Sequence, residues 1–283
     1  MFDSPRENQF TQGTIFSCAY AESYENIATY GLVITARCDA AQNKAPIYNF
    51  VPVVRLTDWI LRDGAEIILQ REMQDLLNRK KSILRQANIS ESLLDSKTTD
   101  EILQLQLIPM AAVDKKIAVK AKEYKEFSNR EVRIKKALDL WDNEILTEEI
   151  KLSRKTLDQV IQELASNRLV GHYLLREMPS LYNDKNGDYV ALLREIHHIK
   201  KATAKKITIG LAKEPIPTQN TQEDSCPRFV GDDDYCMPVA RLKSPWMEHL
   251  MQSLTMLFAR IGIEDIDVTA VKKSLTNLGL DEK

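Results

Sequence analysis

Residues 31–42, "GLVITARCDAAQ", decide how the chain is interpreted, because they join a strand pattern to a trio of reactive residue types. Residues 32–35 are apolar or β-branched and suit a pleated strand. Arg37, Cys38 and Asp39 come directly after them. We therefore expect a β-strand that ends in a loop where a functional site can lie.

Two further strand patterns flank this stretch. Residues 13–20, "GTIFSCAY", precede it and residues 47–56, "IYNFVPVVRL", follow it, with polar segments between them. Pro52 inside the third pattern indicates an edge position or a bulge, because proline cannot donate a ladder hydrogen bond. Together the three patterns predict the start of a small twisted sheet or barrel.

The character of the sequence changes after Leu56. Residues 58–168 carry apolar residues near helical spacing among many charged ones, which predicts a mainly helical segment. Gly64 can divide its first helix, Pro109 can end a second one and Thr147 can cap a later one.

Strand character returns in the last third of the chain. Residues 171–181 and 188–199 flank Asn186-Gly187, a strong hairpin signal. Residues 204–212, "AKKITIGLA", and 235–242, "YCMPVARL", are two further predicted strands. Because strand patterns lie on both sides of the helical segment, the simplest topology is one β core built by both ends of the chain.

A helix is then predicted to begin with Ser244 at its N-cap and Pro245 at its first position. Gly262 suits its end, and residues 267–280 predict a short amphipathic C-terminal helix. The predicted fold is α+β, with an SH3-like β barrel or bent antiparallel sheet interrupted by a helical insertion and followed by a C-terminal helix. Its predicted parts are residues 12–57, the insertion 58–168, and residues 169–283.

Composition limits the function classes. The formal net charge is −2, from 39 basic and 41 acidic residues, which argues against a dedicated nucleic-acid binder on global electrostatics. No apolar run reaches the roughly 18–20 residues needed to span a bilayer, and the first residues lack a basic-then-apolar signal pattern. We expect a cytoplasmic protein without membrane contact, whose four cysteines are reduced.

Cys38 and Asp39 have two interpretations. In the functional one Cys38 is a nucleophile whose thiolate is favoured by Arg37, with His172 as the base. In the structural one Cys38 is a small buried residue at a strand end and Asp39 caps the next turn.

Cysteine spacing argues against a zinc knuckle. Cys18 and Cys38 are 20 residues apart, and Cys226 and Cys236 are 10 apart. We expect no metal site and no cofactor.

Basic stretches leave nucleic-acid binding open. Residues 78–86, "NRKKSILRQ", interleave Lys80 and Lys81 with apolar residues, and residues 113–125 are similar. The other interpretation is a set of solvated helix faces whose lysines are balanced by nearby acids.

The order of strand motifs resembles the PemK/MazF toxin family of plasmid-maintenance ribonucleases. The matching pieces are Gln12-Gly13-Thr14-Ile15, Leu32-Val33-Ile34-Thr35 and Val51-Pro52-Val53-Val54. The resemblance implies an SH3-like barrel and an RNA-cleaving site with an arginine and a threonine. Arg37 and Thr35 lie in the corresponding region, and Arg55 follows the third strand.

A second resemblance spans both ends of the chain. Uncharacterised bacterial proteins combine a "G-V-V-I-S-x-x-C-D" strand with a late "R-L-x-S-P-[YW]-x-E-x-L" helix. The run Arg241-Leu242-Lys243-Ser244-Pro245-Trp246, with Glu248, is similar to the late pattern. This resemblance supports one domain with an insertion and implies no particular activity.

Three function hypotheses follow. The first is a non-enzymatic bacterial interaction protein of a defence (such as antiviral) or toxin–antitoxin-type system, binding a partner protein or nucleic acid. It is favoured because the catalytic pattern of the toxin family is degraded here, with an acidic segment "AESYEN" that disfavours RNA phosphate, and because the chain carries an elaborate charged insertion. The second is a MazF-like endoribonuclease that uses Arg37, Thr35 and His172. The third is an enzyme based on Cys38.

Overall fold

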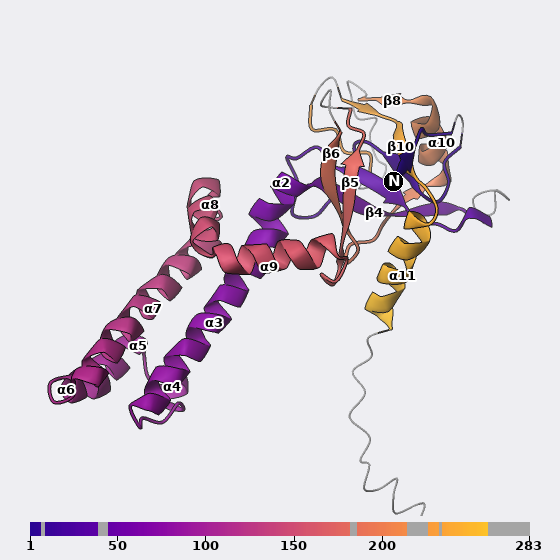
Figure 1. Ribbon diagram of the computed structural model, residues 1–283. Helices are drawn as coiled ribbons and strands as arrows, with labels where there is room; N and C mark the ends of the chain where they lie inside the picture. The colour runs from indigo at the N-terminus through magenta and orange to yellow at the C-terminus, as the bar shows by residue number, and fades with distance from the viewer. Residues whose placement is uncertain (7–8, 39–44, 182–185, 214–225, 232–233, 260–283) are drawn as a thin grey trace, which may run out of the picture.

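An antiparallel β-sheet, curled into a nearly closed barrel, carries a helical arm that projects away from it (Figure 1). The computed structural model describes residues 1–6, 9–38, 45–181, 186–213, 226–231 and 234–259 of the chain. The predicted fold class is confirmed: the fold mixes helices with a barrel-like antiparallel sheet, and a helix follows the last strand.

Both ends of the chain build the sheet. The strand order is β1-β10-β2-β3-β4-β6-β5, and β7 also pairs with β4. Every strand pair is antiparallel, and β10 lies between β1 and β2. The strands of this sheet are β1 (Phe2–Asp3), β2 (Thr14–Phe16), β3 (Tyr30–Val33), β4 (Ile47–Arg55), β5 (His172–Met178), β6 (Gly187–Leu192), β7 (His197–Lys200) and β10 (Pro238–Leu242). A separate pair is formed by β8 (Leu211–Ala212) and β9 (Tyr235–Cys236).

Strand β3 contains residues 31–33 of the stretch "GLVITARCDAAQ", and all four of its residues are buried. Leu32 packs into the core between the sheet and helix α11 (Trp246–Phe258), whereas Val33 packs into the core on the opposite face. A Cβ atom at Gly31 would lie 2.4 Å from Cζ of Phe16 and 3.0 Å from Cδ2 of Phe50. A glycine is therefore required where β3 passes under these rings.

Pro52 lies in the middle of β4, not at an edge of the sheet, so the predicted edge position is wrong. On one side β4 pairs with β3, where Pro52 faces Gly31. On the other side β4 pairs with β7 through residues 47–50 and with β6 from Val53 onward. The proline thus falls where β4 changes partners, and its missing donor leaves the ladder intact.

The arm is an antiparallel helix pair. It leaves β4 as α2 (Leu56–Trp59), a π-helical turn η1 (Ile60–Gly64) and α3 (Ala65–Gln86), and returns as α7 (Lys115–Leu140). Arg62 has φ −121° and ψ −105°, which breaks the first helix just before Gly64, as predicted. The tip of the arm contains α4 (Leu93–Ser96), α5 (Thr99–Ile102), the π-helical turn η2 (Leu103–Leu107) and α6 (Ile108–Ala111).

Three helix boundaries differ from the predictions. Pro109 lies in the first turn of α6 and does not end a helix, because a proline in the first turn needs no donor. After the arm, α8 (Asn143–Leu152) is capped by Asp142 and not by Thr147, since the Asp142 carboxylate accepts hydrogen bonds from the N–H groups of Glu144 and Ile145. Pro245, not Ser244, is the N-cap of α11.

Residues 201–209 form the helix α10 (Lys201–Ile209), so the strand predicted there is wrong. Ala204 and Ile207 are buried three residues apart, which is helical spacing, and pack under the sheet beside Ile199. Only the short β8 follows, after Gly210 with φ +100° ends the helix. Gly262 and the predicted C-terminal helix lie outside the described residues.

Candidate functional site

Arg37 and Cys38 are exposed just beyond β3. Nη2 of Arg37 lies 3.7 Å from Oε1 of Glu248 on α11, and both side chains are about half exposed. Cys38 is not in a disulfide. Its exposure contradicts the interpretation as a buried strand-end cysteine. Asp39 lies outside the described residues.

His172, the predicted base, is the buried first residue of β5. Its Nδ1 atom is 3.1 Å from the carbonyl oxygen of Val170, and its Nε2 atom is 3.8 Å from Oδ2 of Asp63. Its ring packs edge-on against Trp59, with 5.4 Å between ring centroids. These contacts are with η1 and α2, whereas Arg37 contacts α11. The pairing of His172 with Cys38 stays a prediction.

The four residues predicted to bind nucleic acid have different environments. Oγ1 of Thr35 accepts a hydrogen bond from the N–H of Asn49 at 2.7 Å, which extends the pairing of β3 with β4. Arg55 lies at the end of β4. Burial raises the pKa of the Asp58 carboxyl, and the positive charge of Arg55 opposes this rise. Lys80 is buried, and Lys81 is half-buried.

Ion pairs hold much of the arm's positive charge. Lys80 on α3 pairs with Glu131 on α7, and Lys135 pairs with the same carboxylate. Arg71 binds Glu163 on α9 (Arg154–Ala165) through two hydrogen bonds of 2.9 and 2.8 Å. Further pairs join Arg130 and Arg133 to Glu149, and Arg79 to Asp75. These cations are paired with carboxylates of the arm or of α8 and α9, so they do not form an open basic stripe.

The tip of the arm is apolar on its outer side. The run from Ile102 to Val113 contains no charged residue. Ile102, Leu103 and Leu107 are buried inside the tip. The exposed apolar side chains are Leu105 (63%), Ile108 (44%), Met110 (37%) and Val113 (91%). We call these exposed residues the tip patch.

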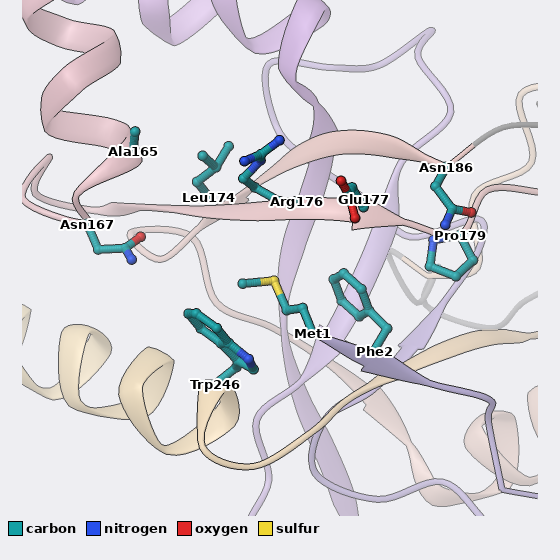
Figure 2. Close-up of a pocket in the computed structure, with 10 residues that line it drawn as sticks. All are labelled: Met1, Phe2, Ala165, Asn167, Leu174, Arg176, Glu177, Pro179, Asn186 and Trp246. Atoms are coloured by element: carbon teal, nitrogen blue, oxygen red, sulfur yellow. The ribbon is translucent and has the colours of Figure 1, made fainter.

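A pocket of about 440 Å³ lies where the barrel fails to close. Strands β1 and β5 are the two ends of the sheet, and residues of both line the pocket. Figure 2 shows Met1 and Trp246 on one side of it, and Arg176 and Glu177 of β5 on the other. We call this pocket the seam.

Three of the four cysteines come together from distant parts of the sequence. Cys18, Cys226 and Cys236 are buried in one core beside Phe16. A hydrogen bond with the Cys18 thiol, together with burial, raises the pKa of the Cys236 thiol. The neutral form of the Cys236 thiol is thus favoured. Within the part of the chain that the structure describes, no group of His, Cys, Asp or Glu side chains is arranged to hold a metal ion.

Sequence reasoning missed both the seam and the tip patch. The uncharged run 102–113 was a usable signal for the tip patch in a chain that is 28% charged. The seam had no sequence signal, because it depends on which strands end the sheet. Among the described residues, no helix is long and apolar enough to cross a membrane. Comparisons of the chain with protein-family models, curated proteins and solved structures found no match.

Proposed function

We propose that the chain is a non-enzymatic bacterial interaction protein of a defence or toxin–antitoxin-type complex, and that it binds a partner protein through the tip patch. The observation that carries the proposal is the exposure of Leu105, Ile108, Met110 and Val113 at the far end of the arm. A helical segment that is apolar on both its inner and outer sides is typical of a surface that becomes buried on assembly.

The energetics suit a binding role. Burying a fully exposed Leu, Ile, Met or Val side chain contributes about 1.5–3 kcal/mol, and each residue of the tip patch gains in proportion to the part of its side chain that is exposed before binding. Arm helices that hold the tip rigidly away from the barrel keep the patch preorganised, which lowers the entropic cost of binding.

The surroundings of the tip patch favour an acidic partner. Lys115, Lys116 and Lys122 are exposed on the first turns of α7, directly after the patch. An amphipathic helix with an apolar face and flanking Asp or Glu residues complements both features. A second copy of this chain would instead bring lysines against lysines.

The ion pairs of the arm favour a protein over nucleic acid as the partner. Lys80, predicted to contact phosphate, is engaged with Glu131. Binding to nucleic acid depends on Lys and Arg side chains that are available to neutralise phosphates and so release the counterions condensed on the nucleic acid. Buried or paired cations contribute little to such binding.

Site-specific photo-crosslinking in the native cells tests the proposal. A photoreactive residue at Val113 should give one discrete adduct, and the partner identified from it should carry an acidic amphipathic helix. The same residue at Asn129, which is exposed on α7 away from the tip, is the matched control and should give no such adduct. Equal crosslinking at both positions, or none at Val113, would refute binding at the tip patch.

The exposure of Arg37 and Cys38 makes the two enzymatic alternatives testable. Purified protein incubated with total RNA should leave the RNA intact. Metal-independent cleavage that disappears in Arg37→Ala would establish the MazF-like endoribonuclease instead. For the Cys38-based enzyme, thiol labelling faster than that of an ordinary exposed cysteine would be required.

A further inference from the structure

We infer that the seam is a peptide-binding groove in which an extended segment of a partner protein, with alternating apolar and uncharged polar residues, adds as a strand between β5 and β1. This inference goes beyond the tip patch, because it lies on the barrel and involves other residues. It rests on the edge strands, on an unsatisfied acceptor and on the side chains that face the groove.

The edge of β5 is available for pairing. Within the described residues β5 pairs with β6 alone, and β1 pairs with β10 alone. The N–H of Leu193 donates to the carbonyl of Gly171 at 2.9 Å, which sets the alternation of the ladder. Tyr173 and Leu175 therefore direct their backbone groups to β6, and Leu174 directs its N–H and C=O to the seam. Such an edge is a template for strand addition.

Asn167 supplies an acceptor that needs a donor. It follows α9, and its Oδ1 atom is buried with no hydrogen-bond partner among the residues that the structure describes. Asn167 lines the seam at the α9 end, as Figure 2 shows. A buried acceptor without a donor costs about 1–3 kcal/mol, so a ligand N–H at this point would be stabilising. A peptide backbone provides such donors at regular intervals.

The two faces of the groove fix the side chains of the added strand. Toward the barrel interior, Tyr173 and Leu175 belong to the core, and Phe2 packs against it. Toward the outside, the Arg176 side chain is 64% exposed, its Nε lies 3.8 Å from Oδ1 of Asp188, and Glu177 also lines the seam. Because a strand alternates its side chains, apolar residues should face inward and uncharged polar residues should face this mixed-charge side.

The probe is an end-capped hexapeptide of alternating valine and threonine, titrated into the full chain by calorimetry. We expect a dissociation constant in the range of about 10–100 μM. The same peptide N-methylated at alternate residues keeps its side chains but loses backbone donors, and it should bind at least about tenfold more weakly. Equal binding of the two peptides, or no heat up to about 1 mM peptide, would overturn the inference.

Protein variants locate the site. Leu174→Pro removes the N–H that faces the seam and should abolish binding, whereas Leu174→Ala keeps the N–H and should retain it. Asn167→Ala should weaken binding about fivefold. Unchanged binding in a folded Leu174→Pro protein would place the peptide elsewhere. Ile108→Asp, at the tip patch, should bind the peptide normally, so failure of the seam and failure of the tip proposal are distinguishable.

Discussion

The ammonium group of Lys80 on α3 and the carboxylate of Glu131 on α7 form an ion pair that joins the two long helices of the arm. The Lys80 side chain is only 4% exposed, and Glu131 also binds Lys135 of its own helix. Lys80, which the sequence suggests as a contact for nucleic acid, therefore joins the two long helices of the arm.

Breaking this pair should destabilise the arm. Lys80→Ala leaves Glu131 partly buried with Lys135 as its remaining cation, and we expect a loss of about 2 kcal/mol in the free energy of unfolding. Denaturant unfolding followed by helical circular dichroism measures it. Arg154→Ala removes an exposed pair with Asp158 and is the matched control, with an expected change below about 0.5 kcal/mol.

The arm should lose stability in acid. The hydrogen bond from Arg71 lowers the pKa of Glu163. Burial raises the pKa of Glu131, but the bonds from Lys135 and Lys80 outweigh it and lower the pKa overall. Since both folded-state pKa values lie below the unfolded values near about 4.3, the stabilisation is present above that pH and disappears as the pH falls through the folded values.

Thermal melts from about pH 6 down to about pH 3 measure this effect. The melting temperature should fall toward the acid end, and a Glu131→Gln, Glu163→Gln double variant should fall less steeply. Parallel pH profiles for the two proteins would show that these carboxylates do not carry the acid sensitivity.

Gly31→Ala should weaken the barrel. Its new methyl group would meet the Phe16 ring inside contact distance, and overpacking of this kind costs about 1–3 kcal/mol. The change is measured as a shift in the denaturant midpoint. Ala36→Ser, at an exposed position beyond the same strand, is the control. A Gly31→Ala protein as stable as the native one would mean that the ring packing is wrong.

Thiol titration should count one reactive cysteine in the native protein. Cys38 is exposed and should react with a disulfide reagent at the rate of an ordinary thiol. Cys18, Cys226 and Cys236 are buried, and they should react only after denaturation. Mass spectrometry of the labelled protein identifies each site. Rapid native labelling of two or more cysteines would contradict the packing of the three buried thiols.

The strands of the barrel could be predicted because their residues carry a local signal. Leu32 and Val33 alternate between two cores, and the Asn186-Gly187 dipeptide lies at the turn end of the β5–β6 hairpin. The error at α10 has the opposite cause. Residues 207–209, "ITI", have high β propensity, but burial of Ala204 and Ile207 on one side selects the helix.

The candidate sites could be predicted only in part, because they depend on tertiary neighbours. Cysteine spacing along the chain does not show that Cys18, Cys226 and Cys236 share one core. Burial of Lys80 depends on how α3 and α7 pack against each other. The seam exists because β1 and β5, which are about 170 residues apart in the sequence, are the two edges of one sheet.

The size of the assembly that the chain forms in its native cells tests the central claim most directly. Tagged wild-type protein, purified gently and measured by light scattering during gel filtration, should elute in a complex clearly larger than the monomer. The Ile108→Asp protein, with the same fold by circular dichroism, should elute as a monomer. The account is contradicted if the wild-type chain is itself a monomer without a bound partner, or if the substitution leaves the complex intact.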